Sequence, residues 1–163
     1  MSTIATLVVG RDGSTTKDAT SRNISSSADR ASFLNRRRQV DVIIIGGNTA
    51  RNEPYSRTPV PLIICSRSSI NPVVENENSQ IWNCSPDEAI DKARKVFGEN
   101  ILIEGGARMI VELVENQKID QLELSITEVI GGENILDWQL LLSKFKHVEM
   151  QQIEDTQFFS ASN

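Results

Sequence analysis

The sequence predicts an α/β protein with a mostly parallel central sheet, helices on both faces of that sheet and an antiparallel hairpin at the C-terminus. Three observations predict this fold class. Apolar β-rich runs alternate with helical segments, four expected strands end in glycine or polar residues, and the last two expected strands are joined by the short turn Glu154-Asp155. With 163 residues and 39% hydrophobic content, the chain fits a single domain over residues 1–163.

The first part of the chain is expected to form a strand, a long loop and a helix. The β-branched run from Ile4 to Val9 predicts a central strand that stops at Gly10. Residues 13–21 are polar and non-periodic, and we expect a loop of this length to border a ligand. A serine N-cap, an acidic first turn and a basic last turn predict a helix over residues 26–38.

Two buried strands and an exposed loop are expected next. Residues 40–45 and 61–65 are continuous apolar runs, which are typical of strands buried on both faces. The polar residues 48–54 between them predict a turn. Residues 68–79 are rich in asparagine and glutamate and predict an exposed loop, after which residues 81–83 predict a short strand.

A helix, a strand and a second helix are expected in the following segment. Residues 85–97 begin with a serine cap, a proline and two acidic residues, and a glycine follows them, so they predict a helix with defined ends. Residues 101–104 predict a strand, and residues 107–117 predict a helix.

The chain is expected to end in three strands. Residues 120–127 alternate apolar and polar side chains, which is the pattern of a strand with one solvated face. Residues 147–153 and 156–161 predict the two strands of a hairpin.

Composition argues against several classes of protein and partner. The chain has no run of about 18 apolar residues and no secretory signal layout, so we expect a cytoplasmic protein without a membrane partner. A net charge of −5, 5% aromatic residues and the lack of a recognised motif argue against nucleic acid. Cys65, Cys84 and His147 include no close pair of zinc ligands, and we expect neither a metal site nor a disulfide.

Residues 101–106 join a β-rich run to a carboxylate and two glycines, immediately before a helix. The free N–H groups and positive dipole of such a helix start suit an anion, although a glycine pair also serves a simple tight turn. Gly10, Gly46-Gly47 and Ser66 end other strands. Because the carboxyl ends of parallel strands meet at one rim, we expect these segments to share a cleft.

Charge is unevenly distributed along the chain. Residues 1–60 carry a net charge of +4 and residues 61–163 a net charge of −9. The basic half is therefore the expected seat of anion contacts. Arg36-Arg37-Arg38 lies in this half, and as a whole the triplet is equally compatible with the solvated end of a helix.

A set of spaced motifs extends over about residues 4–135. They are Asp12-Gly13, Ser21-Arg22-Asn23-Ile24-Ser25, Arg37, Asp41-Val42-Ile43-Ile44-Ile45-Gly46, Thr49, Asn52-Glu53-Pro54, Glu104-Gly105-Gly106 and Asp120-Gln121-Leu122-Glu123-Leu124. Together they resemble the pyrimidine reductase domain of bacterial riboflavin biosynthesis. The resemblance implies a dihydrofolate-reductase-like fold.

The resemblance also implies NADPH as the cofactor. Thr49, three residues after the strand glycine, is the implied contact to the nicotinamide cofactor, and the segment from Gly106 to Ile110 is implied to bind its phosphates. Asn23 stands where the family has a tryptophan, and Asn52 replaces an acid in a turn that is one residue shorter. The implied cofactor-binding residues are Asn23, Thr49, Asn52, Glu53, Ser66, Gly105, Gly106, Ala107, Arg108, Met109 and Ile110.

A phosphorylated pyrimidine is the implied substrate, and Ser21, Arg37, Arg57 and Glu104 are the implied contacts. The guanidinium of Arg37 suits a sugar phosphate because it donates two parallel hydrogen bonds, whereas Arg57 matches the family only loosely. Glu104 is the catalytic candidate, to orient the substrate or relay a proton; the same carboxylate could instead cap the next helix or pair with an arginine.

The implied activity is the NADPH-dependent reduction of a phosphoribosylamino-pyrimidine to its ribitylamino product. Two alternatives stay open within the resemblance: a nucleotide-binding protein without turnover, which the departures at Asn23, Asn52 and Arg57 permit, and a dihydrofolate or pteridine-type reductase. An unrelated phosphate-binding α/β domain is a third.

The resemblance bears on assembly as well. The family is commonly dimeric and the C-terminal strands look exposed, so we expect a homodimer. The zinc deaminase that often precedes this reductase has no counterpart here, because no His-x-Glu with a Pro-Cys-x-x-Cys partner occurs.

Overall fold

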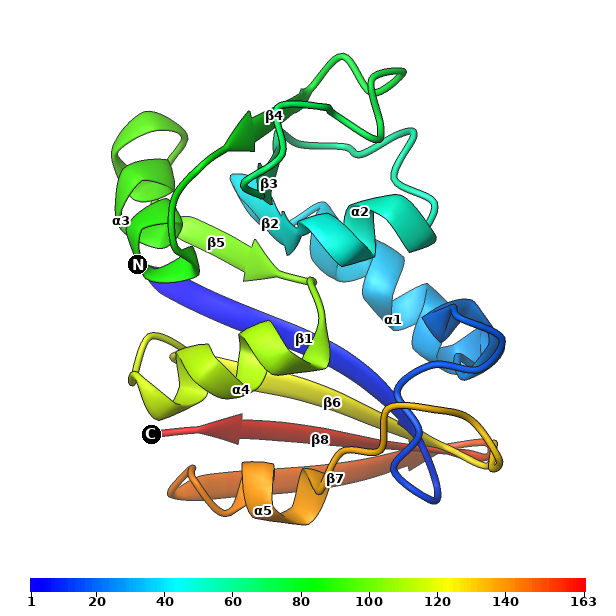
Figure 1. The fold of residues 1–163 in the computed structure, drawn as a ribbon. Coiled ribbons are helices and arrows are strands. Elements are labelled where there is room, and N and C mark those ends of the chain that lie inside the picture. Colours follow the sequence, from blue (N-terminus) through cyan, green and yellow to red (C-terminus); the bar gives the residue numbers. More distant parts are fainter.

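One eight-stranded sheet organises the chain in the computed structural model, which describes residues 1–163 (Figure 1). The strands are β1 (Ser2–Gly10), β2 (Val42–Gly46), β3 (Leu62–Cys65), β4 (Ser79–Trp82), β5 (Asn100–Ile103), β6 (Gln121–Thr127), β7 (His147–Ile153) and β8 (Thr156–Ser162). Their order across the sheet is β4-β3-β2-β5-β1-β6-β8-β7. The neighbouring strands β4, β3, β2, β5, β1 and β6 are all parallel to one another, and β8 pairs antiparallel with both β6 and β7. The predicted fold class is therefore confirmed.

Helices cover both faces of the sheet. They are the short 3-10 helix η1 (Ser21–Asn23), α1 (Ser27–Arg37), α2 (Gly47–Asn52), α3 (Pro86–Val96), α4 (Ala107–Glu115) and α5 (Trp138–Leu142). Side chains of α3, α4 and α5 pack into one cluster of buried residues, and α2 contributes to a second cluster. The view in Figure 1 places α1 with α2, away from α3 and α4.

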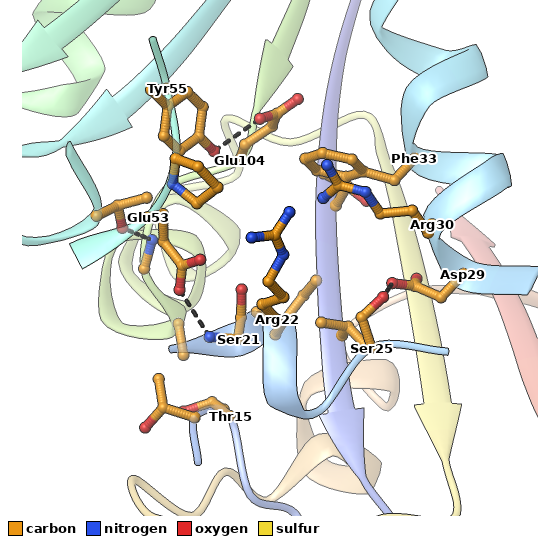
Figure 2. A pocket seen from close by; sticks show the side chains of 18 of the residues that line it. Thr15, Ser21, Arg22, Ser25, Asp29, Arg30, Phe33, Glu53, Tyr55 and Glu104 are labelled. Carbon is orange, nitrogen blue, oxygen red and sulfur yellow. Dashed lines mark hydrogen bonds between the residues drawn. The ribbon is translucent and has the colours of Figure 1, made fainter. Parts of the chain in front are cut away.

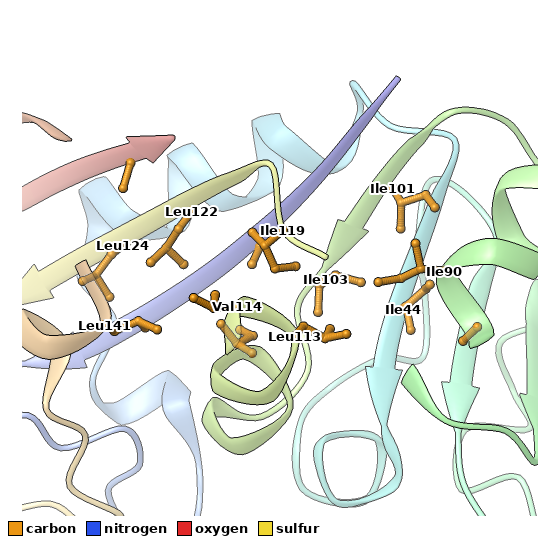
Figure 3. Close-up of a cluster of buried hydrophobic side chains, with 14 of the residues drawn as sticks. Ile44, Ile90, Ile101, Ile103, Leu113, Val114, Ile119, Leu122, Leu124 and Leu141 are labelled. Carbon is orange, nitrogen blue, oxygen red and sulfur yellow. The ribbon is translucent and has the colours of Figure 1, made fainter. Parts of the chain in front are cut away.

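Alternation along the central strands divides the core between the two faces. Val42 and Ile44 belong to the cluster beneath α3 and α4, whereas Ile43 and Ile45 belong to the cluster beneath α2. All four side chains are fully buried, which is why β2 is a continuous apolar run in the sequence. Figure 3 shows the larger cluster, in which Ile44, Ile101 and Ile103 of the sheet meet Ile90 and Leu113 of the helices.

Local capping explains where the two longest helices begin. The Ser26 hydroxyl accepts the N–H of Asp29 at 3.1 Å at the start of α1. Ser85 and Glu88 form a reciprocal capping box at the start of α3, with Pro86 as its first residue. The predictions of both helices are confirmed.

Two short helices differ from the sequence-based expectations. Residues 48–54 were expected to form a turn, but residues 47–52 form α2, which begins directly after β2. Helix α5 follows the loop after β6 and was not predicted. Segments of five or six residues are too short to show a helical repeat of apolar side chains, so their helical state depends on the sheet against which they pack.

The C-terminal hairpin is confirmed, with Glu154 in the left-handed region at its turn (φ 55°). Strand β7 forms the open edge of the sheet, and every one of its residues is exposed. No helix in the structure combines the length and the apolar character that a bilayer crossing requires.

Candidate functional site

A cavity of about 150 Å³ opens between β1, α1, the loop after β1, and the segments that follow β2 and β5. Nineteen residues line it. The predicted site residues among them are Ser21, Arg37, Thr49, Glu53, Glu104, Gly106 and Ala107. Figure 2 shows Glu104, Glu53 and Ser21 around one space, although they lie on three different segments of the chain.

Glu104 lies one residue beyond β5, and its backbone N–H still donates to the carbonyl of Ile44 at 3.1 Å. This bond keeps the carboxylate beside the end of β2, where its side chain is completely buried. The Glu104 carboxylate accepts two hydrogen bonds from Arg37, from Nε at 2.8 Å and from Nη2 at 2.7 Å. The hydroxyl of Tyr55 donates a third, at 2.7 Å.

Arg37 projects from the last turn of α1 and is held by more than its ion pair. The guanidinium carbon lies 4.4 Å from the ring centre of Phe33 and 5.0 Å from that of Tyr55. Burial opposes the charge of Arg37, but the hydrogen bonds and charge of Glu104 outweigh burial and raise the pKa of the guanidinium. Nη1 is the only guanidinium nitrogen without a partner in the protein, so it remains available to a ligand.

The three consecutive arginines at the end of α1, Arg36, Arg37 and Arg38, lie in different surroundings. Arg36 turns to the sheet, where its Nη1 donates to the Thr6 hydroxyl at 2.7 Å, and Arg38 is exposed beyond the helix. Only Arg37 lines the cavity.

Tyr55 belongs to the site and was missed by the sequence analysis. It is the only tyrosine of the chain and directly follows Pro54, but no local pattern marks it as a partner of Glu104. Burial and, after it, the charge of Glu104 raise the pKa of the Tyr55 hydroxyl well above its usual range. The hydroxyl therefore stays protonated and acts as a hydrogen-bond donor to the carboxylate.

Thr49 connects the segments that follow β2 and β5. Its hydroxyl accepts the N–H of Gly106 at 2.9 Å, immediately before α4 begins. The first N–H groups of a helix have no partner within the helix. Gly106 and Ala107 line the cavity, so the start of α4 presents a positive dipole end to it.

Glu53 forms hydrogen bonds to the loop that precedes α1. One carboxylate oxygen accepts the N–H of Ser21 at 2.7 Å and the other accepts the Thr20 hydroxyl at 3.0 Å. The hydroxyl of Ser21 makes no hydrogen bond within the protein and lines the cavity. The loop over residues 13–21, expected to border a ligand, does border the cavity.

The same loop is anchored at its other end by Asp12. This carboxylate accepts the hydroxyl of Ser14 at 2.6 Å and the N–H of Gly131 at 2.7 Å. The bond from the Ser14 hydroxyl, followed by that from Gly131, lowers the pKa of Asp12 to about 2. The loop is thus held against the segment that follows β6.

Eight predicted site residues do not line the cavity. Asn23 and Asn52 are exposed, and their side-chain amides donate to the carbonyls of Lys17 and Asn48. Arg57 and Arg108 are exposed as well. The remaining four are Ser66, Gly105, Met109 and Ile110.

Ile110 leaves no group free for a cofactor. Its side chain is fully buried in the core, and its N–H donates to the carbonyl of Gly106 at 3.2 Å. Gly105 is buried against the end of β2.

Two further arginines line the cavity and were not singled out from the sequence. Arg22 lies on η1 and Arg30 on the first turns of α1, and both are exposed. No group of three or more His, Cys, Asp or Glu side chains is arranged to hold a metal ion.

Comparisons with known proteins agree with this architecture. The family model described as the RibD C-terminal domain matches residues 2–157. No curated protein sequence matches the chain.

Solved structures similar to this chain share its fold at low sequence identity. A deaminase/5-amino-6-(5-phosphoribosylamino)uracil reductase from Thermotoga maritima is 16% identical with a TM-score of 0.78, over 98% of this chain and 56% of that one. A pyrimidine reductase-like protein from Corynebacterium diphtheriae is also 16% identical, with a TM-score of 0.74, over 99% and 91%. RibD from Acinetobacter baumannii is 15% identical with a TM-score of 0.72, over 99% and 57%. This chain thus spans little more than half the length of the first and third.

Proposed function

Because this chain belongs to the family of the RibD C-terminal domain, we propose that it is an NADPH-dependent reductase of a phosphoribosylamino-pyrimidine. The observation that carries the proposal is that one cavity joins the start of α4 with the group formed by Glu104, Arg37 and Tyr55. The first feature suits cofactor phosphates, and the second suits a polar substrate.

The residues around the start of α4 fit such a cofactor. Thr49 fixes Gly106, Gly105 packs closely on β2, and the N–H groups that open α4 are free of helical partners. We propose that these groups hold the phosphates of NADPH. When bound, NADPH supplies a hydride to the ribose carbon next to the pyrimidine amine, and the bond from that carbon to the ring oxygen breaks as the oxygen takes a proton.

The chain contributes orientation and an enclosed environment to this reaction. Glu104 accepts three hydrogen bonds from Arg37 and Tyr55, and we propose that it acts by orienting both side chains. Arg37 lines the cavity and keeps Nη1 free of protein partners, and we propose that this nitrogen donates to a sugar hydroxyl or to the ring oxygen.

Turnover measurements test the proposed function. Purified protein is mixed with NADPH and 5-amino-6-(5-phosphoribosylamino)uracil, loss of NADPH is followed by absorbance, and the ribitylamino product is identified by mass spectrometry. Formation of that product supports the proposal. Binding of NADPH without turnover favours the non-catalytic alternative, turnover of dihydrofolate alone favours the pteridine-type reductase, and absence of NADPH binding contradicts all three.

Thr49→Val is expected to raise the dissociation constant for NADPH about two- to tenfold, because valine cannot accept the N–H of Gly106 and the start of α4 loses an anchor worth one hydrogen bond. Fluorescence titration with NADPH measures this change. Ser143→Ala is the control, since the exposed Ser143 hydroxyl donates to the carbonyl of Leu140 at 2.6 Å, outside the cavity. Equal affinities for NADPH in wild type and Thr49→Val would remove Thr49 from the cofactor site.

We also propose that the protein is a homodimer formed through β7. This strand lies at an edge of the sheet and is paired on one side only. The exposed fractions of Val148 and Met150 on it are 44% and 54%. Open apolar edges of this kind tend to pair with another strand. Light scattering at micromolar concentration is expected to give twice the chain mass of 18.1 kDa, and Met150→Lys is expected to shift the mass toward the monomer. A monomeric mass for the wild type would contradict the dimer.

A further inference from the structure

Arg22 and Arg30 present two unpaired guanidinium groups to the cavity. Each residue forms hydrogen bonds through its backbone only: the N–H of Arg22 donates to the Thr20 hydroxyl at 3.2 Å, and that of Arg30 to the carbonyl of Ser26 at 2.9 Å. Figure 2 shows the two side chains entering the same space from different elements, Arg22 from η1 and Arg30 from α1.

The carboxylates of the cavity do not neutralise these arginines by direct pairing. Glu104 is bound by Arg37 and Tyr55, and both oxygens of Glu53 are bound by the loop before α1. Asp29 accepts the hydroxyl of Ser25 at 2.5 Å. Every acidic side chain that lines the cavity therefore already has a donor from elsewhere, whereas two full sets of guanidinium donors remain open.

Of the two arginines expected to contact the substrate, neither is well placed to bind its phosphate. The charge of Arg37 is already paired with the Glu104 carboxylate through Nε and Nη2, so this guanidinium attracts a second anion less strongly than an unpaired one does. Arg57 is exposed and does not line the cavity. Arg22 and Arg30 line the cavity with unpaired guanidinium groups, and Ser21 lines it with a hydroxyl that has no partner in the protein.

We propose that Arg22 and Arg30, with the Ser21 hydroxyl, form the subsite for the phosphate of the substrate, while Arg37 serves the sugar. The proposal rests on the proposed function in that it assigns the phosphate to the substrate. Guanidinium groups match the geometry of phosphate oxygens, and two of them match the charge of a phosphate dianion. The phosphate is thereby held between η1 and α1.

Binding of ribose 5-phosphate, with ribose for comparison, tests the subsite directly. In calorimetric titrations the dissociation constant of ribose 5-phosphate is expected to rise about tenfold or more in Arg22→Gln and in Arg30→Gln, and further in the double variant, because each loses charge-assisted hydrogen bonds. Arg38→Gln is the matched control: this arginine is exposed at the end of α1 and lies outside the cavity. Unchanged binding of ribose 5-phosphate in the double variant would overturn the proposal.

A second titration separates substrate phosphate from cofactor phosphate. The dissociation constant for NADPH is expected to stay within about twofold in both single variants; a rise for NADPH with none for ribose 5-phosphate would assign the arginines to the cofactor and overturn the proposal. In the turnover assay, KM for the phosphorylated pyrimidine is expected to rise more than kcat falls. Arginine-dependent binding of ribose 5-phosphate by a protein without turnover would leave the subsite standing and remove the proposed function. Turnover with an unchanged KM in the double variant would support the proposed function and overturn the phosphate subsite.

Discussion

Replacing Glu104 by leucine is expected to destabilise the protein by about 3–5 kcal/mol, because the substitution leaves the Arg37 guanidinium buried without its anion. Arg37→Met is expected to cost a similar amount, since it leaves the Glu104 carboxylate without its main donors. Urea denaturation of the two variants measures these free energies of unfolding.

The double variant Arg37→Met/Glu104→Leu separates the structural from the functional role of this pair. Two apolar side chains of similar volume remove both buried charges at once, so most of the lost stability is expected to return. Turnover is not expected to return, because the cavity then lacks the guanidinium that we propose as the contact to the substrate. A double variant as active as wild type would show that the pair only supports the fold. Single variants as stable as wild type would contradict the burial of the pair.

Gly105→Ala is expected to destabilise the protein by about 1–3 kcal/mol and to weaken NADPH binding. A Cβ at this position would lie 2.6 Å from both the Cα of Ile45 and the backbone nitrogen of Gly46. Both are backbone atoms at the end of β2, and they cannot move without disturbing the centre of the sheet. The segment before α4 would have to lift away from β2, and the proposed cofactor site would shift with it.

Gly46→Ala is the control for this prediction. The nearest neighbour of a Cβ at Gly46 is the terminal methyl of Met109 at 3.3 Å, which belongs to a flexible side chain that can move aside. In thermal unfolding, the melting temperature of Gly105→Ala is expected to lie well below that of Gly46→Ala. Equal melting temperatures would show that the turn before α4 can relax away from β2 at little cost.

Elements with local signals could be predicted from the sequence. Ser85, Pro86 and Glu88 lie within one turn and specify the start of α3 by themselves. The apolar run at residues 40–45 could be predicted because a strand buried on both faces must be apolar throughout. Helix α2 could not, because its six residues stabilise one another too little without the sheet beside them.

The members of the candidate site could be predicted more readily than their interactions. Glu104, Arg37 and Thr49 were expected to contact the substrate or the cofactor, and all three line the cavity. Gly10, Gly46-Gly47 and Ser66, which were expected to share a cleft with Glu104, do not line it. The sequence contains no sign that Glu104 would bind Arg37 and Tyr55, which lie 67 and 49 residues away along the chain. The structural alternative for Glu104, pairing with an arginine, is the role that the structure shows.

The sequence by itself thus determined the order of the eight strands and of the helices α1, α3 and α4, the glycine-rich ends of the strands and the basic character of the first 60 residues. Each of these properties depends on residues a few positions apart, where helix caps, alternation and composition act. Tertiary structure alone decided which arginine is consumed by an ion pair and which remain free. Packing of α1 on the sheet brings Arg37 to Glu104 and leaves Arg22 and Arg30 facing the cavity without an anion. That outcome depends on the distance and orientation of side chains from separate segments, which no local pattern of residues contains.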